Sequence, residues 1–494
     1  MKKKKQVIKR KEESQKELKL DKRDLTKGSI LKTLIFLSLP IILANVLQTL
    51  YNVTDTFWVG RLGANAVAAV SLSFPLIFLV TSLGGGLTMA GTILVAQYRG
   101  KKDFKNVDFI SAQTIIILLF VSIILSISAY LLSDKLLTLI GATAETLPIA
   151  SSYFKISSIG FTFVFGFLII QSLLRGAGEV KMPLYIVIFT VLLNFILDPL
   201  FIFGWKFIPA MGAAGAAAAT IGTQAIATIL GLGLMIKGKY GIHLKKKNFK
   251  PNFKIFKKIF FLGFPSSIEQ SARALGMSIR TFLFATFGTI ALAAFGIGTR
   301  IFVFVFIPAM GFSMGAATMI GQNIGAGKIE RTKKIIKTSI IFNIIFLGLI
   351  GLITFIFAKS LVSFFIPSDI EVIAQGTTLL RYLTISFSLI GIELTILGTF
   401  RGAGRTGVSM ALSLISLWLI ELPLAIILAK FTPLGLLGLL IAYPVSDLIS
   451  TIVTIIVFKK VDWKSKKLIE DAKSKKSRMQ EEIREECIEE SPEI

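Results

Sequence analysis

The sequence predicts an all-α membrane protein with twelve transmembrane helices, arranged as two pseudo-symmetric six-helix lobes around a central cleft. Three observations carry this prediction: long apolar runs, basic residues concentrated in alternate loops, and an ordered internal repeat. Hydrophobic residues make up 53% of the chain and charged residues only 17%, against about 25% charged in ordinary soluble domains. Runs of about 20 apolar residues cross a hydrocarbon layer as helices, in which every backbone N–H and C=O finds a partner.

The apolar runs set the order and limits of the predicted spans. They lie at 31–59, 67–98, 108–132, 150–174, 184–204, 213–236, 259–286, 291–321, 335–357, 372–400, 408–429 and 435–458. Prolines inside a helix remove a backbone hydrogen bond and favour a kink. Candidate kinks therefore lie at Pro40, Pro75, Pro265 and Pro308.

The loops divide the chain into five parts. They are a basic N-terminal segment at 1–30, an N-lobe of six helices at 31–236, a basic linker at 237–258, a C-lobe of six helices at 259–458 and a charged tail at 459–494. The formal net charge is +26, with the Lys and Arg mostly in the tails and in alternate loops. The positive-inside rule then predicts a multi-pass protein of the cell (inner) membrane with both termini cytoplasmic. Nucleic-acid binding is the weaker interpretation of this charge, whereas contact of the tail with membrane lipids stays open.

Cysteine and histidine are almost absent from the chain. The one cysteine is Cys487 and the one histidine is His243. These counts exclude a disulfide framework and a zinc, haem or iron–sulfur site built from such residues. We expect no enzyme activity, no cofactor beyond a coupling ion, and a monomeric protein.

An internal repeat relates the two halves of the chain. Matching residues run in the same order along both halves: Pro40 with Pro265, Gly63 with Gly288, Gln97 with Gln322, Gly100 with Gly325, Arg175–Gly178 with Arg401–Gly404, and Gly212 with Gly435. Because each half has six spans, the repeats are parallel and an axis along the membrane normal relates them. We expect both Arg-Gly-Ala-Gly boxes at cytoplasmic helix ends, with glycine at positive φ and the arginine on helix carbonyls or lipid phosphate.

The predicted first lobe carries buried acids without an evident cation. Asp55, Asp198 and Thr220 reach a similar depth, and Asn194 lies one helical turn before Asp198 on the same face. Lys155 is the one candidate to neutralise the two carboxylates. An ionisable group in lipid is costly, so we interpret this cluster as a site for a proton or for Na⁺, whose ligands are hard oxygens. A polar cluster that only packs the lobe is the alternative.

The predicted second lobe has mixed charges. Glu269 and Arg273 are spaced i,i+4, which favours an ion pair, and Arg280 follows on the same face. Glu393, Glu421 and Asp447 lie in later spans, with Arg300 and Arg381 as candidate partners. Candidate residues of a substrate cleft are Tyr51, Asn52, Glu269, Arg273, Arg280 and Glu393.

Several of these segments resemble the multidrug and toxic compound extrusion (MATE) family. The resemblance rests on Pro40–Gly63, on Gln171–Gly178, on Asn194–Pro199 and on Gly212–Thr220, and it covers roughly residues 25–460. It implies a twelve-helix exporter of organic, often cationic compounds in exchange for Na⁺ or H⁺, with the cation at Asp55, Asn194, Asp198 and Thr220. Ile390 stands where one branch has an acid, so the chain is more similar to the branch named after a DNA-damage-inducible protein.

The leading hypothesis is therefore a cation-coupled exporter that works by alternating access. A lipid-linked glycan flippase of the same architecture is the alternative. Arg273, Arg280 and Arg300 would favour it by giving the cleft positive charge.

Overall fold

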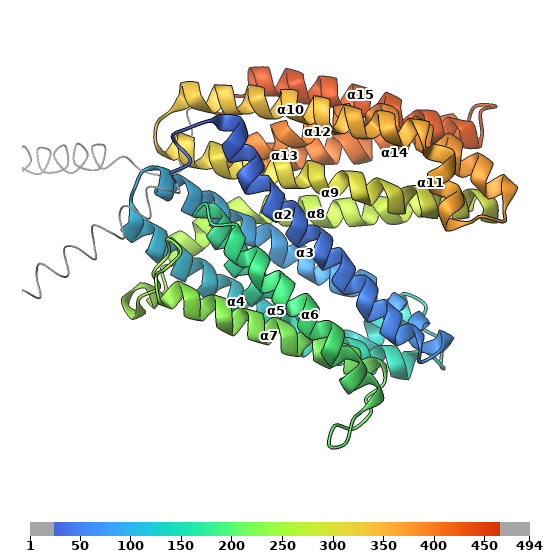
Figure 1. Ribbon diagram of the computed structural model, residues 1–494, viewed down its shortest axis with the longest axis horizontal. Helices are drawn as coiled ribbons and strands as arrows, with labels where there is room; N and C mark the ends of the chain where they lie inside the picture. The colour runs from blue at the N-terminus through green and yellow to red at the C-terminus, as the bar shows by residue number, and fades with distance from the viewer. Residues whose placement is uncertain (1–23, 465–494) are drawn as a thin grey trace, which may run out of the picture.

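The computed structural model describes residues 24–464, and this part of the chain is mostly helical; the connection 237–252 between the two halves contains the 3₁₀ helix η1 (Lys246–Phe249). Two groups of helices lie side by side (Figure 1). The first group is α2 (Ile30–Gly60), α3 (Ala64–Gly100), α4 (Phe104–Leu139), α5 (Leu147–Gly176), α6 (Lys181–Phe203) and α7 (Ala213–Ile236). The second is α8 (Phe253–Ala285), α9 (Thr289–Gly325), α10 (Ile329–Ile356), α12 (Ile370–Gly402), α13 (Thr406–Leu414), the π-helix η2 (Ile415–Glu421), α14 (Leu422–Lys430) and α15 (Leu436–Lys460).

The prediction of a helical membrane protein is confirmed. Between residues 24 and 464, eleven helical segments are long and apolar enough to cross a membrane, with α13, η2 and α14 forming one of them. The twelfth long helix is α8, which is less apolar because its central turns carry Glu269, Arg273 and Arg280. Its 33 residues are enough to span a bilayer.

Side-chain caps mark the starts of some helices. The side chain of Asp103 accepts the backbone N–H of Asn106 at the start of α4, at 3.2 Å. Asn252 accepts the N–H of Ile255 in the same way at the start of α8, at 3.1 Å. Such caps satisfy backbone donors that have no partner within the helix, so these two polar residues stabilise the starts of α4 and α8.

Two features of the second lobe were not expected from the sequence. A short helix, α11 (Ala358–Phe365), lies between α10 and α12. It buries Ala358 and Val362 and exposes Phe364, a pattern typical of a helix lying on a surface. The expected span 408–429 is also interrupted by the seven-residue π-helix η2. Neither feature follows from hydropathy, because α11 lies in the expected connection between two spans and η2 changes the backbone hydrogen bonding inside an apolar span.

Repeated glycines adopt matching conformations in the two lobes. Gly178 and Gly404, the last residues of the two Arg-Gly-Ala-Gly boxes, have φ of 83° and 78°. The helix-starting Gly212 and Gly435 have φ of 58° and 55°. Only glycine adopts these angles at little cost, so the positive φ predicted for the boxes is confirmed and the repeat extends to backbone geometry.

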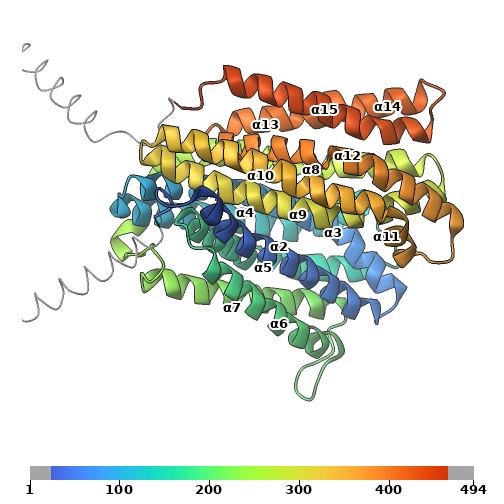
Figure 2. The same cartoon turned by 45° about the horizontal axis from the view of Figure 1, so that its top comes forward.

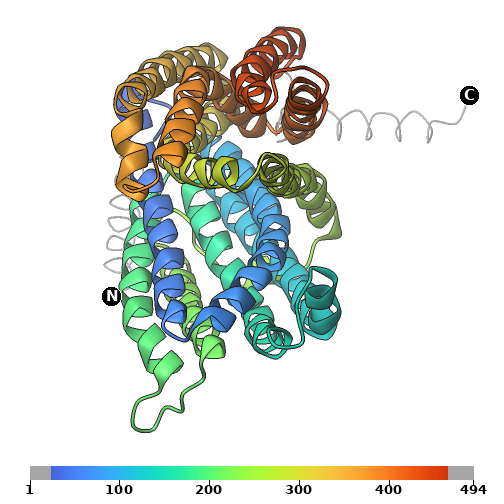
Figure 3. The same ribbon diagram turned by 90° about the vertical axis from the view of Figure 1, so that its right-hand side faces the viewer.

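The lobes meet along α3, which packs against α8 and α9, and along α2, which packs against α9. The end view separates the blue-to-green first lobe from the orange-to-red second lobe, with α8 and α9 between them (Figure 3). α6 and α7 lie at the edge of the molecule opposite α14 and α15 (Figure 2). This placement repeats across the pseudo-symmetry axis.

A reciprocal pair of hydrogen bonds joins the lobes at the end that carries the basic loops. Gln97 Nε2 donates to the carbonyl of Gly402 at 3.2 Å, and Gln322 Nε2 donates to the carbonyl of Gly176 at 3.0 Å. The two glutamines occupy equivalent repeat positions on α3 and α9, and both glycines belong to Arg-Gly-Ala-Gly boxes. We call these four residues the glutamine seam.

Two further glycines allow the backbones to touch beside the glutamine seam. A Cβ atom added at Gly100 would lie 1.8 Å from the carbonyl oxygen of Gln322, and one at Gly325 would lie 2.0 Å from that of Gln97. Real Cβ atoms do not approach so closely. The main chains of α3 and α9 therefore touch directly beside the glutamine seam, a contact that only glycine permits at positions 100 and 325.

Candidate functional site

The first lobe holds an acidic cluster built from α2, α6 and α7. Asp198 on α6 is fully buried, and Asn194 Nδ2 donates to its Oδ1 at 2.7 Å. The i,i+4 spacing places both side chains on one face of the helix. This contact is the one expected from the sequence spacing.

Asp55 and Tyr51 of α2 complete the acidic cluster. The carboxyl of Asp55 lies close enough to interact electrostatically with that of Asp198. The Tyr51 hydroxyl shares a 2.8 Å hydrogen bond with Thr223 Oγ1 and also contacts Thr220. The structure thus brings together all four residues predicted for a cation site.

Two residues of the cluster were missed by sequence reasoning. Thr223 lies one helical turn beyond Thr220 on α7, a spacing that could have suggested it. Tyr153 on α5 is buried within electrostatic reach of both carboxyls. Tyr51, which the sequence suggested as a cleft residue, is buried in this cluster, whereas Asn52 is exposed beside it.

Three oxygens of the cluster are buried without a hydrogen-bond partner. They are Asp55 Oδ1, Asn194 Oδ1 and Asp198 Oδ2. Lys155 does not neutralise them, because its Nζ pairs with Asp134 at 2.9 Å. Within residues 24–464, neither carboxyl of the cluster makes an ion pair. Buried unsatisfied acceptors are costly, and three from three side chains fit a bound proton or a hard cation such as Na⁺.

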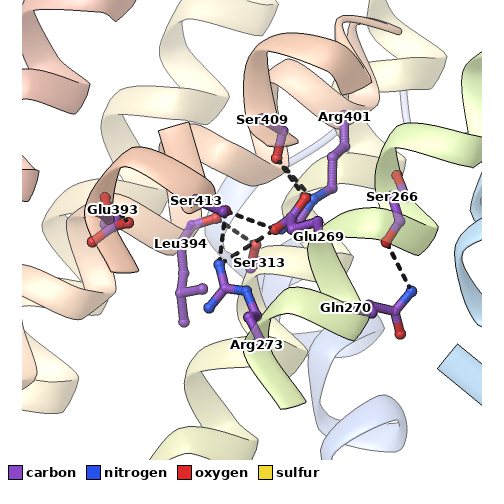
Figure 4. A network of polar contacts seen from close by, with 11 residues as sticks. Ser266, Glu269, Gln270, Arg273, Ser313, Glu393, Leu394, Arg401, Ser409 and Ser413 are labelled. Atoms are coloured by element: carbon purple, nitrogen blue, oxygen red, sulfur yellow. Dashed lines mark hydrogen bonds and ion pairs between the residues drawn. The ribbon is translucent and has the colours of Figure 1, made fainter. Parts of the chain in front are cut away.

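In the second lobe, the buried carboxylate of Glu269 is neutralised by cations. Glu269 on α8 is 3% exposed and forms ion pairs with Arg273 at 3.3 Å and with Arg401 (Figure 4). Ser413 Oγ donates to Glu269 Oε1 at 2.9 Å, and Ser409 Oγ donates to Oε2 at 3.2 Å. The i,i+4 ion pair predicted for Glu269 is confirmed, and every oxygen of this carboxylate is occupied.

Arg401 corrects the expectation for the second Arg-Gly-Ala-Gly box. Its guanidinium binds Glu269 and Ser409 rather than helix carbonyls or lipid phosphate. The equivalent Arg175 donates instead to Met314 Sδ of the other lobe at 3.3 Å. Sequence reasoning missed these contacts because each joins two separate helices: Arg401 of α12 meets Glu269 of α8, and Arg175 of α5 meets Met314 of α9.

One further acid of the second lobe, Glu421, also has a cation partner. Arg280 forms an ion pair with Glu421, while the expected partners Arg300 and Arg381 do not. Arg300 is exposed, and Arg381 lies over the ring of Phe355 at 5.3 Å. The expectation was wrong because it could not include the rotation of each helix.

Glu393 stands apart from the ion pairs of the second lobe. It accepts a 3.1 Å hydrogen bond from Ser416 Oγ and lies separately from Glu269 in the close view (Figure 4). It is close enough to interact with the charges of Arg273 and Glu421.

A serine motif of the second lobe is structural. Gly311, Ser313 and Gly315 have the G-x-S-x-G spacing of hydrolase nucleophiles, which require a strand-to-helix turn. Here the motif lies inside α9, and Ser313 Oγ donates to the carbonyl of Leu394 at 2.5 Å. The serine is buried and committed to helix packing.

A wide-open apolar recess lies where the lobes meet. It has a volume of about 660 Å³ between α3, α8, α13 and η2. Trp418 Nε1 and Ser271 Oγ are buried in its wall without partners. Pockets for drug-sized molecules have volumes of about 300–1,000 Å³, with mostly apolar walls and a few polar groups. We call it the interlobe cavity; its wall includes Leu79, Leu83, Phe264, Ile268, Leu275 and Trp418.

Known proteins match both halves of the chain. The MatE family model matches residues 40–200 and again residues 265–427. The probable multidrug resistance protein YpnP of Bacillus subtilis is 31% identical over 90% of this chain and 98% of its own length. The probable multidrug resistance protein NorM of Thermotoga maritima is 29% identical over 89% of this chain and 94% of its own length.

A solved structure shares the fold. A multidrug resistance MATE family transporter in an outward-facing conformation superimposes with a TM-score of 0.82 and 23% identity, covering 88% of this chain and 96% of that one. The two family matches fall in the two halves of the internal repeat. The chain therefore belongs to the MatE family of multi-pass membrane transporters.

Proposed function

We propose that this protein exports organic, often cationic compounds in exchange for Na⁺ or H⁺. The observation that carries this proposal is the set of three buried, unpartnered oxygens on Asp55, Asn194 and Asp198. A cation bound there would satisfy them, and its release would leave two carboxyls facing each other. The names of the relatives, which are multidrug resistance proteins, support the exported class.

Ion binding would act on the arrangement of the first lobe. The cluster joins α2, α6 and α7, so a cation held between them favours the packing in which its ligands converge. Substrate binding would favour the alternative packing, in which these ligands do not converge. Alternating access then follows from two ligands that bind different states of one molecule.

The interlobe cavity is the proposed substrate site. Its apolar wall suits organic molecules, and its contact with both lobes would let substrate respond to their relative position. A lipid-linked glycan flippase is less favoured, because two of the three arginines that would hold a pyrophosphate are engaged, Arg273 by Glu269 and Arg280 by Glu421, and the third, Arg300, is exposed.

The deciding experiment is efflux of a fluorescent organic cation from proteoliposomes under an imposed Na⁺ or H⁺ gradient. We expect Asp55→Asn and Asp198→Asn each to reduce gradient-driven efflux to the level of empty liposomes. Asp134→Asn is the matched control, since Asp134 pairs with Lys155 outside the cluster. Retained coupling in both cluster variants would show that the acids are structural. Running the two gradients separately identifies the ion.

We further propose that the protein is a monomer in the inner membrane with both termini cytoplasmic. The basic loops at one end support this topology. Cys487, the only cysteine, lies in the tail outside the described residues and provides a natural reporter. An impermeant maleimide should label it in inverted vesicles and not in intact cells. Labelling of intact cells would contradict the orientation.

A further inference from the structure

A second cavity lies at the end of the molecule that carries the basic loops. It has a volume of about 590 Å³ between the first turns of α8 and the turn that joins α12 to α13. Its wall contains four cationic residues, Lys254, Lys257, Lys258 and Arg405, and no acidic residue. We call it the basic cavity.

The part of the basic cavity that lies farther from the N-terminus of α8, which we call its lower wall, is apolar. Phe261, Leu262, Pro265 and Val408 line it, and the Lys257 ammonium lies 5.9 Å from the centre of the Phe261 ring. Phe261 is 65% exposed. Cations above an apolar wall match an amphiphile that has an anionic head and hydrocarbon chains.

The Arg405 side chain has unused hydrogen-bonding capacity. One nitrogen, Nη2, donates to the carbonyl of Asp462 at 2.7 Å, while Nε is buried with no partner. An anion in the basic cavity could accept this N–H. A charge-assisted hydrogen bond of this kind is stronger than one between neutral groups.

The internal repeat supplies a comparison within the same chain. In the first lobe, the residue after the Arg-Gly-Ala-Gly box is Glu179, which accepts the N–H groups of Lys181 and Met182 at 3.0 and 3.2 Å. The Glu179 side chain thereby caps the N-terminus of α6. The equivalent residue after the second box is Arg405, and the N-terminus of α13 has no side-chain cap. The carboxylate that fills the first position is thus replaced by a cation at the second.

We propose that the basic cavity binds the head group of an anionic phospholipid. An uncapped helix N-terminus attracts negative charge, and the lysines and Arg405 add to that attraction. Basic recesses between transmembrane helices are suited to anionic lipid heads. The apolar lower wall favours a lipid over a soluble anion or an acidic peptide such as 481–494 of this chain.

The experiment titrates the detergent-purified full-length protein with phosphatidylglycerol or phosphatidylcholine and counts bound lipid by native mass spectrometry. We expect phosphatidylglycerol to bind at least tenfold more tightly than phosphatidylcholine. The variant K254Q/K257Q should lose roughly fivefold in affinity for each cation removed. R405E places at this position the negative charge that Glu179 carries in the first lobe. This variant should lose more affinity for phosphatidylglycerol than K254Q/K257Q. Both lysines are exposed, so the first variant tests binding without disturbing the fold.

Matched controls separate this site from general surface charge. K334Q/K337Q removes two exposed lysines of α10 that lie outside the basic cavity and should bind lipid like the unmodified protein. Equal loss in that control, or equal binding of the two lipids, would overturn the proposal. So would equal affinity for glycerol phosphate, which lacks acyl chains, or lipid binding that appears only after deletion of 481–494.

Discussion

At the scale of single residues, the two lobes treat a buried carboxylate in opposite ways. Asp198 keeps an unpartnered oxygen, whereas Glu269 has two arginines and two serines around it. Removing one partner of a buried ion pair leaves an uncompensated charge and costs about 3–5 kcal/mol. Removing a carboxylate that has no cation partner relieves repulsion instead.

Glu269→Gln should therefore lower the thermal stability of the purified transporter, because Arg401 and Arg273 would lose their counter-charge. Adding Arg401→Met to Glu269→Gln should restore part of the loss. The measurement is the melting temperature in detergent for both single variants and the double variant. Additive losses would show that the two side chains do not interact in the folded protein.

Asp198→Asn should leave the melting temperature unchanged or raise it, since the buried carboxyl faces Asp55 without a cation. The same variant should remove the stabilisation that the coupling ion gives to the unmodified protein. Thermal unfolding with and without NaCl, and at two pH values, checks both expectations. A large loss of stability without any ion effect would mean that Asp198 only packs the lobe.

Some of these residue contacts could be predicted from the sequence and others could not. The Asn194–Asp198 and Glu269–Arg273 contacts lie within one helix, where i,i+4 spacing fixes the geometry. Arg401 meets Glu269 across helices, and Arg280 meets Glu421 on η2. Such pairs depend on the rotation and depth of separate helices, which a single sequence does not specify.

At the scale of helices, the glutamine seam depends on close contact between α3 and α9. Gly100→Ala should force the two helix ends apart, because the added methyl would overlap the Gln322 carbonyl oxygen. Spin labels placed near the ends of α3 and α9 should show a longer distance between the two labels by electron paramagnetic resonance. Transport should fall as well. Gly222→Ala on α7 is the control, since an added Cβ there meets no atom within 4 Å. Unchanged distances in Gly100→Ala would refute this account.

The spans could be predicted because apolar length is a local property of the chain. The helices confirm them, with ends that differ by up to seven residues, as at the end of α4 (139 against the expected 132). The π-helix η2 and the surface helix α11 could not be predicted in this way. A π-turn changes which carbonyl each N–H bonds, without a required change in composition, and it places Glu421 where Arg280 reaches it.

At the scale of the whole molecule, the two lobes have similar backbone arrangements but differ in their buried charges. If ion and substrate favour different states, each must weaken the binding of the other by the same factor. Calorimetric titration of substrate with and without the coupling ion, and of ion with and without substrate, should give equal ratios. Unequal ratios would mean that the two ligands are not linked through a single conformational equilibrium.

The glutamine seam also limits how this transporter can change over time. Both of its acceptors are main-chain oxygens, which no point mutation removes. Mutations in this region can therefore act on the two glutamine side chains that donate the hydrogen bonds. They can also add volume at the neighbouring Gly100 and Gly325, where the main chains touch. A mutational library of this region should recover few working clones at positions 100 and 325. Because the bonds come as a symmetric pair, loss of one glutamine leaves the equivalent bond in place, a redundancy that follows from the internal repeat.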